Sequence, residues 1–227
     1  MESNRILTNF QIEVLKEISK SRLSPFIVWS GGTALSFYYL RHRLSYDLDF
    51  LSQELIPDDY ILAEIKKISQ NLKIKKVEEQ KRFNRYEFWF KKNKDSLKIE
   101  FVFYPFPFIE KPKKIKDLNI KIDSIKDILT NKAHSIFERS EPKDVFDFYC
   151  ILVYFPNIKQ AQIFKWIEKK FGVIIDPVLF YSKVLRGADN LNLIKPLIFK
   201  KDILNIKKIK EYFKKQAEDY LRKKIKR

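Results

Sequence analysis

The chain has 227 residues, 45% of them hydrophobic, and its 46 Lys and Arg against 29 Asp and Glu give a formal net charge of +17. This composition is ample for the core of one large domain or two small ones. It excludes a bilayer-spanning helix, because no apolar run is long enough, and a signal peptide, because the first residues lack an apolar stretch. The single cysteine, Cys150, excludes an intrachain disulfide, fits a small core residue and indicates a cytoplasmic protein.

The positive charge bears on the choice of partner. A field of this size attracts polyanions. Nucleic acid is therefore the leading candidate partner, and an acidic protein is the second.

The first predicted elements are a helix, a strand and a second helix. Residues 8–21 have apolar side chains at helical spacing, and Thr8 can cap that helix. The run Phe26-Ile27-Val28-Trp29 is short, apolar and bounded by turn residues, which predicts a buried strand. A helical pattern follows over residues 33–41, and its aromatic side chains are expected in the core.

Ser30, Gly31 and Gly32 separate that strand from the second helix. Glycine has no Cβ, so backbone N–H groups can approach a bulky anion closely. The start of a helix adds free N–H donors and a positive dipole end. An isolated Gly-Gly turn is usually only a turn, but here it predicts a phosphate cradle made by these three residues.

Asp47 and Asp49 follow in the segment Asp47-Leu48-Asp49-Phe50-Leu51. Residues two apart in a strand share a face, so both carboxylates point one way, and Leu48 and Phe50 point into a core. Adjacent carboxylates repel each other unless a cation lies between them. Mg²⁺ is the usual cation, held by one or two carboxylates and by phosphate oxygens of the substrate. One stretch therefore predicts both a triphosphate cradle and a site for one or two Mg²⁺ ions.

The segments SGGTAL (residues 30–35) and RHRLSYDLDF (residues 41–50) resemble the opening motif of the polymerase-beta-like nucleotidyltransferases. They are most similar to the AbiEii/AbiGii toxin-type branch of that superfamily. The resemblance implies a nucleotidyltransferase fold with a mixed sheet and flanking helices. It also implies supporting roles for Arg43 and Ser45 in binding the nucleotide.

The next elements are a helix over residues 57–72, a strand over 74–79 and a hairpin formed by 82–90 and 96–104. Glu100 is the acid inside the last strand. It can be a cross-strand partner of a nearby lysine. Alternatively, it is the third metal-binding carboxylate that the polymerase-beta-like scheme requires on a neighbouring strand, and we favour this second role. The family often has aspartate at this position.

A proline- and lysine-rich connector with a short strand at 118–122 precedes a change to helical patterns. We therefore predict an α+β protein with two domains. Residues 1–123 form a polymerase-beta-like nucleotidyltransferase domain, and residues 124–227 form a C-terminal helical bundle. The final helix, over about 202–227, is rich in Lys and Arg, and it is either a solvated surface or a contact for an RNA backbone.

Within the second domain, the pattern K-x6-R-x3-K-D-x2-D-x-Y from Lys132 to Tyr149 resembles the second AbiEii-type signature. The resemblance implies that Lys132 neutralises the triphosphate and that Asp144 is its acidic companion in the active site. Asp144 and Asp147 are three residues apart and can share a helical face. Acids are also common in a first helical turn for reasons of stability alone.

These observations lead to a functional hypothesis with two alternatives. We expect a Mg²⁺-dependent nucleotidyltransferase that moves a nucleoside monophosphate from an NTP to an acceptor hydroxyl, with Asp47, Asp49 and Glu100 as metal ligands. The charge favours an RNA end such as tRNA, and the resemblance implies a toxin encoded beside an antitoxin. The alternatives are an antibiotic-type enzyme with a small-molecule acceptor and a non-catalytic basic module that binds RNA or protein.

Overall fold

The structure is a computed structural model that describes residues 6–199 and 205–225. The chain divides into two compact units, Met1–Ser124 and Ile125–Arg227. Within the described ranges, no helix combines the length and the hydropathy that a membrane crossing requires.

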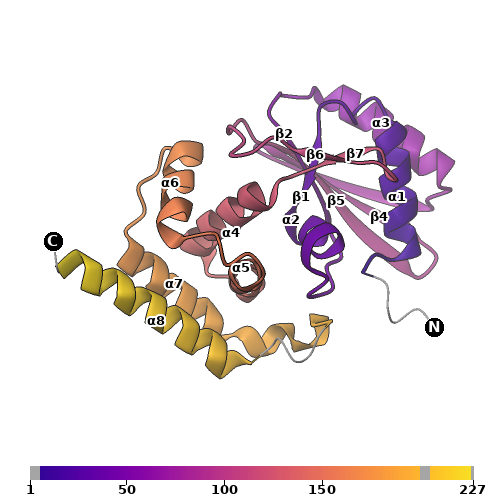
Figure 1. Cartoon of the computed structure of the whole chain (residues 1–227). Coiled ribbons are helices and arrows are strands. Elements are labelled where there is room, and N and C mark those ends of the chain that lie inside the picture. Colours follow the sequence, from indigo (N-terminus) through magenta and orange to yellow (C-terminus); the bar gives the residue numbers. More distant parts are fainter. Residues whose placement is uncertain (1–5, 200–204, 226–227) are drawn as a thin grey trace. The chain divides into compact units, whose positions relative to one another are not determined.

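The first unit is an α+β structure built on a mixed sheet (Figure 1). Its described strands follow the order β3-β4-β5-β2-β1-β7-β6, in which the pairs β2–β5 and β1–β7 are parallel and the others are antiparallel. The strands are β1 (Val28–Ser30), β2 (Leu48–Ser52), β3 (Lys76–Arg82), β4 (Arg85–Lys92), β5 (Asp95–Phe103), β6 (Lys113–Ile115) and β7 (Ile120–Ile122). The helices are α1 (Asn9–Lys20), α2 (Gly31–Ala34), the π-helical η1 (Leu35–Leu40) and α3 (Asp58–Asn71).

Helices α1 and α3 lie along one side of the sheet (Figure 1). Thr8 starts α1 with a capping box, because its hydroxyl accepts from the Gln11 N–H while the Gln11 side chain accepts from the Thr8 N–H. The apolar stripes of both helices pack on inward-facing strand residues in a single core. Fully or nearly fully buried members of this core include Val14, Ile18, Ile65, Phe50, Phe88, Ile99 and Phe101.

Alternation along the strands puts polar side chains on the opposite face of the sheet. In β5, Leu97, Ile99 and Phe101 face the core, so Lys98 and Glu100 point the other way. In β2, Leu48 and Phe50 are completely buried, so Asp49 shares the face of Glu100. The predicted burial of Leu48 and Phe50 is confirmed.

The structure corrects several predicted element boundaries. The first strand is Val28–Ser30 rather than 26–29, and the helix begins directly at Gly31. Tyr38 is 43% exposed, so the prediction that it belongs to the core is wrong. The strand predicted at 74–79 spans Lys76–Arg82 and joins β4 through a turn that the sequence analysis did not identify.

The second unit is helical in its described part. Its helices are α4 (Ile125–Arg139), α5 (Pro142–Tyr154), α6 (Gln160–Phe171), α7 (Pro177–Asp189), the 3-10 segment η2 (Leu191–Leu197) and α8 (Ile206–Ile225). Pro142 opens α5, where its missing N–H costs nothing. Aromatic side chains fill the core, and Cys150 is buried among them as predicted. Of the predicted final helix, residues 202–204 and 226–227 lie outside the described residues.

Candidate active site

Gly31 forms the turn between β1 and α2, and two features of the turn require glycine there. Its φ is +78°, a left-handed conformation that side chains disfavour. A Cβ at this position would lie 2.0 Å from Asp49 Oδ2 and 2.8 Å from Asp49 Cγ. The absent side chain therefore makes room for the Asp49 carboxylate against the backbone of the turn.

Gly32 has the same role for two other predicted residues. A Cβ on Gly32 would lie 2.4 Å from Arg43 Nη2 and 3.1 Å from Ser45 Oγ. Arg43 is only 2% exposed, and its Nη1 donates to the Leu44 carbonyl at 3.0 Å. The structure thus brings Arg43 and Ser45 to the glycine turn, and their roles in binding the nucleotide stay predictions.

Ser30 is held by an acid that the sequence analysis missed. Its hydroxyl donates to Asp123 Oδ2 at 2.9 Å, and both residues are buried. Asp123 follows β7, which pairs with β1 in parallel, and its backbone carbonyl accepts from the Tyr39 hydroxyl at 2.9 Å. Because the Ser30 hydroxyl donates its hydrogen bond to Asp123, the groups of this turn that could contact a phosphate are its backbone N–H groups.

Two of the predicted acids, Asp49 and Glu100, occupy neighbouring positions on one face of the sheet. Asp49 and Glu100 are register partners on the parallel strands β2 and β5. Glu87 on β4 is in turn the register partner of Glu100. Asp47 lies directly before β2, two residues from Asp49. Neighbouring strands are about 4.8 Å apart, so the row brings three carboxylate side chains side by side.

Two cations engage Glu100 in this structure. Lys98 Nζ bridges Glu100 Oε1 and Glu87 Oε1, the latter at 2.6 Å. Arg85 Nη1 lies 3.1 Å from Glu100 Oε2. Burial lowers the pKa of Lys98, but its hydrogen bonds and charge interactions with Glu100 and Glu87 outweigh burial and raise that pKa overall. Both Glu100 oxygens are therefore in ion pairs, with Lys98 of the same strand and with Arg85 of the neighbouring strand β4, so the cross-strand partner is an arginine and not a lysine.

Among the side chains that the structure describes, no group of three or more His, Cys, Asp or Glu is placed to hold a metal ion. The metal-binding role of Asp47, Asp49 and Glu100 stays a prediction, and in this structure Glu100 is ion-paired with Lys98 and Arg85. The donor set nevertheless suits Mg²⁺, which is bound by one or two carboxylates and completed by substrate phosphates and water. The contact between Asp49 and Gly31 supports this fit, because it puts a carboxylate at the turn proposed to bind phosphate.

In the second unit, Lys132 and Asp144 belong to a buried network between α4 and α5. Lys132 Nζ lies 2.6 Å from Asp144 Oδ1 and 2.9 Å from Asp147 Oδ2. Arg139 Nη2 contacts Asp144 Oδ2 at 2.8 Å. Burial raises the pKa of Asp144, but Lys132 and Arg139 outweigh burial, so the pKa lies below its ordinary value. Asp144 therefore stays ionised at neutral pH.

Sequence reasoning missed the residues that contact the predicted site side chains. Asp147 is the second acid that pairs with Lys132. Its three-residue spacing from Asp144 had indicated only that the two side chains can share a helical face.

Asp123, Arg85 and Glu87 carried no sequence signal of their own, because their roles arise from contacts across the sheet. Lys98 lies two residues before Glu100 on the same strand, so its spacing was a local signal.

Comparisons with known proteins give a consistent result. The family profile described as nucleotidyl transferase AbiEii toxin, type IV TA system, matches residues 13–225. The uncharacterised protein aq_aa25 of Aquifex aeolicus (strain VF5) is 27% identical over 234 residues, which cover 96% of this chain and 98% of that protein.

Two crystal structures from Helicobacter pylori are similar over nearly the whole chain. One, described as a candidate nucleotidyltransferase, has 19% identity and a TM-score of 0.57, and covers 94% of this chain and 99% of its own. The other, JHP933, has 20% identity and a TM-score of 0.56, and covers 96% and 95%. At identities this low, the structural similarity to these two proteins shows a shared fold alone.

Proposed function

We propose that this chain transfers a nucleoside monophosphate from an NTP to a hydroxyl group at an RNA end. The chain belongs to the AbiEii nucleotidyltransferase toxin family and is a nucleotidyltransferase. Its cofactor in this proposal is Mg²⁺. The observation that carries the proposal is the position of Asp49, which lies against the Gly31 turn and is the register partner of Glu100. A carboxylate at this point can serve a metal-bound triphosphate and an acceptor hydroxyl together.

The chain's own residues divide the work of phosphoryl transfer in this proposal. Asp47 and Asp49 would hold Mg²⁺, which supplies charge neutralisation to the triphosphate when bound. The backbone N–H groups of Gly31 and Gly32 bind phosphate oxygens, and Ser45 and the buried Arg43, which lie close to Gly32, hold the turn in shape.

Glu100 is proposed to take up the proton that the attacking hydroxyl group loses. The acceptor oxygen forms a bond to the α-phosphorus while the bond to pyrophosphate breaks, and the hydroxyl proton passes to a carboxylate. Glu100 can take this proton when it leaves its ion pairs with Lys98 and Arg85. Lys98 and Arg85 then offer their charge to phosphate groups instead. Pyrophosphate is the second product.

Lys132 and Asp144 enter the proposal through the second motif. Lys132 is proposed to offset charge on the triphosphate, and Asp144 to hold its ammonium group in a defined position. The 2.6 Å contact between their side chains supports the second of these roles.

The acceptor and the biological role follow from charge and family. A net charge of +17 suits a polyanionic acceptor, and tRNA is the RNA that we favour. The family description places AbiEii enzymes in type IV toxin-antitoxin systems, so we propose a toxin that acts in the cytoplasm and is counteracted by an antitoxin.

The experiment follows transfer of label from α-³²P-labelled NTPs to total RNA, with and without Mg²⁺. We expect Mg²⁺-dependent labelling of RNA that Asp49→Asn abolishes. Asp59→Asn, which changes an exposed acid on α3, is the matched control and should retain activity. Labelling of small hydroxyl compounds instead of RNA would support the antibiotic-type alternative. Absence of transfer to every acceptor with all four NTPs would support the non-catalytic binding module.

A further inference from the structure

A two-residue turn, Phe83-Asn84, joins β3 to β4, and its first residue is unusual for such a turn. Arg82 and Arg85 are the last register partners on either side. Phe83 has φ of +32°, in the left-handed region that bulky side chains disfavour. Turns of this length normally use Asn, Asp or Gly at such positions. Phenylalanine is therefore a poor choice for forming the turn.

Burial does not compensate for this choice, because Phe83 is 102% exposed. A phenylalanine normally stabilises a fold by removing apolar area from water. The turn itself is held firmly: the Phe103 N–H donates to the Asn84 carbonyl at 2.8 Å, and Asn84 Nδ2 donates to the Phe103 carbonyl at 3.1 Å. The hairpin thus presents an aromatic ring to solvent from an ordered tip, at a cost to the stability of the chain.

The tip is strongly basic. The five residues Lys81-Arg82-Phe83-Asn84-Arg85 carry three cations, whose side chains are 52%, 65% and 42% exposed in chain order. The surrounding segment 75–98 holds seven Lys and two Arg against three Glu and one Asp, a net charge of +5. An exposed aromatic ring among accessible cations is the combination that binds single-stranded nucleic acid, through base stacking and phosphate contacts.

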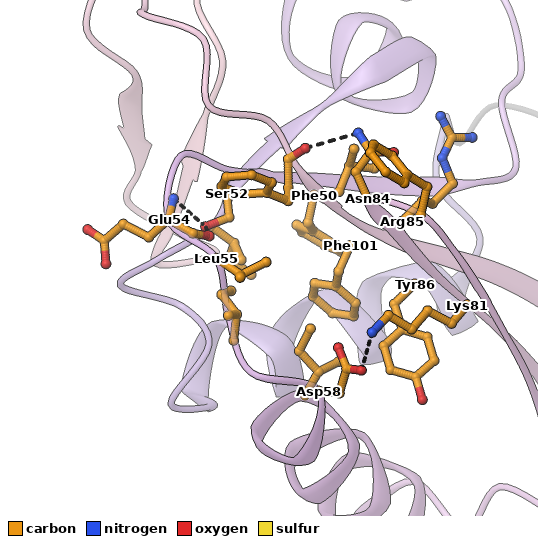
Figure 2. A pocket seen from close by; sticks show the side chains of 16 residues that line it. Phe50, Ser52, Glu54, Leu55, Asp58, Lys81, Asn84, Arg85, Tyr86 and Phe101 are labelled. Atoms are coloured by element: carbon orange, nitrogen blue, oxygen red, sulfur yellow. Dashed lines mark hydrogen bonds and ion pairs between the residues drawn. The ribbon is translucent and has the colours of Figure 1, made fainter.

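A second feature beside the tip points to a different occupant. Phe83 and the 74%-exposed Leu55 help to line a cavity of about 80 Å³ that reaches Phe50, Tyr86 and Phe101. Figure 2 shows Leu55 and Lys81 on opposite sides of this cavity. Its charged lining residues are two acids and two bases, Glu54, Asp58, Lys81 and Arg85, so the cavity has no charge preference. The cavity would fit a small aliphatic side chain of a partner, and that side chain would contact Leu55 as much as Phe83.

We propose that Phe83 is a stacking platform for a base of single-stranded RNA, with Lys81, Arg82 and Arg85 binding the adjacent phosphates. The role of this platform in holding the acceptor rests on the proposed function. Arg85 connects the two sites, because its Nη1 is 3.1 Å from Glu100 Oε2. Phe83 precedes Glu87, the register partner of Glu100, by four residues, so their Cα atoms are at most roughly 14 Å apart. The stacked base therefore lies within a few nucleotides of the reacting end.

The first test measures binding of a fluorescein-labelled, unstructured RNA of about 12 nucleotides by anisotropy, without NTP or Mg²⁺. Phe83→Leu keeps an apolar side chain but removes the ring, and we expect it to weaken binding by roughly 5- to 100-fold. Phe83→Tyr should bind like the unchanged protein, and so should Leu55→Ala. Arg82→Gln should reduce the slope of log affinity against log salt by about 0.7.

Either of two results in this assay would overturn the proposal. One is equal binding by Phe83→Leu and the unchanged protein. The other is an equal loss in Leu55→Ala and Phe83→Leu, which would assign the tip to an apolar partner docked over the cavity.

A stability measurement separates a binding role from a structural one. Phe83→Asn replaces the ring with a residue that accepts a left-handed conformation. It should raise the unfolding temperature by roughly 2–4 °C and still weaken RNA binding. A variant that unfolds at a lower temperature would contradict the argument that Phe83 costs stability.

Turnover distinguishes failure of this inference from failure of the proposed function. With a labelled NTP and the same RNA, Phe83→Leu should raise KM for RNA and leave kcat unchanged. Transfer that is indifferent to Phe83 would end the inference and leave the proposed function standing. Absence of transfer by the unchanged protein, with RNA binding that still requires the ring, would reject the proposed function and retain the platform.

Discussion

Asp49 and Glu100 lie opposite each other on two parallel strands, and the Asp49 carboxylate also touches the position that a Gly31 side chain would occupy. This relationship joins a motif near residue 30 to an acid seventy positions later. It also makes the candidate site testable one residue at a time, because Glu100, Gly31 and Lys98 each have a matched control residue. These controls are Glu87, Gly172 and Lys91.

Glu100 and Glu87 allow a matched comparison of two acids in one row. Both are buried, and both bind Lys98, but only Glu100 is the register partner of Asp49. If Glu100 accepts the hydroxyl proton, Glu100→Gln should lower kcat by about 10²-fold or more. Glu87→Gln should keep kcat within about threefold of the unchanged protein, since Glu87 is not a register partner of Asp49, and it should lower stability because it breaks a buried ion pair. Similar losses in both variants would assign Glu100 a purely structural role.

Gly31→Ala should damage both stability and activity, for two separable reasons. A left-handed residue with a Cβ costs about 1–2 kcal/mol. The new Cβ would also lie 2.0 Å from Asp49 Oδ2 and displace that carboxylate. The control is Gly172→Ala, because Gly172 has φ of +68° but nothing within 4 Å of its Cβ position.

We expect both alanine variants to unfold at lower urea concentration, and Gly31→Ala alone to lose transfer activity. Retention of full activity by Gly31→Ala would show that the position of Asp49 is unimportant for the reaction.

Lys98 should oppose metal binding by holding Glu100. Removing its charge in Lys98→Met frees one Glu100 oxygen, so Mn²⁺, read by electron paramagnetic resonance, should bind a few-fold more tightly in the absence of nucleotide. Lys91→Met is the control, because Lys91 pairs with Glu78 at 2.7 Å and not with Glu100 or Glu87. Unchanged Mn²⁺ affinity in Lys98→Met would mean that the ion pair with Glu100 does not compete with the metal.

Lys132→Met should shift the pH dependence of stability. The pKa of Asp144 lies below its ordinary value of 3.8 in the folded chain, so its ion pairs stabilise the fold above that value. This stabilisation is lost as the pH falls through the folded pKa. Without Lys132 the Asp144 pKa rises, and stability should begin to fall at a higher pH than in the unchanged protein.

The measurement is the urea midpoint from neutral pH down to about pH 3. Removing one partner of a buried ion pair should also lower the free energy of unfolding by about 3 kcal/mol at neutral pH. Lys143→Met, at an exposed position on α5 beside Asp144, should follow the unchanged protein. Parallel curves for Lys132→Met and the unchanged protein would contradict the proposed control of the Asp144 pKa.

Local patterns in the sequence predicted much of the fold and part of the candidate site. Alternation in Asp47-Leu48-Asp49-Phe50 indicated which side chains enter the core, and burial of Leu48 and Phe50 confirms it. The turn at Phe83 escaped prediction for a local reason as well. Turn signals rest on residues that tolerate positive φ, and phenylalanine is not one of them.

By itself, the sequence determined the family, the α+β class and the presence of acids beside a glycine turn, because these depend on residue types at short spacing. Only the tertiary structure decided that Glu100 faces Asp49, that Asp123 binds Ser30, and that Arg85 holds Glu100. Strand order and register set these contacts. They result from packing the whole sheet on its helices, so no short stretch of sequence contains them.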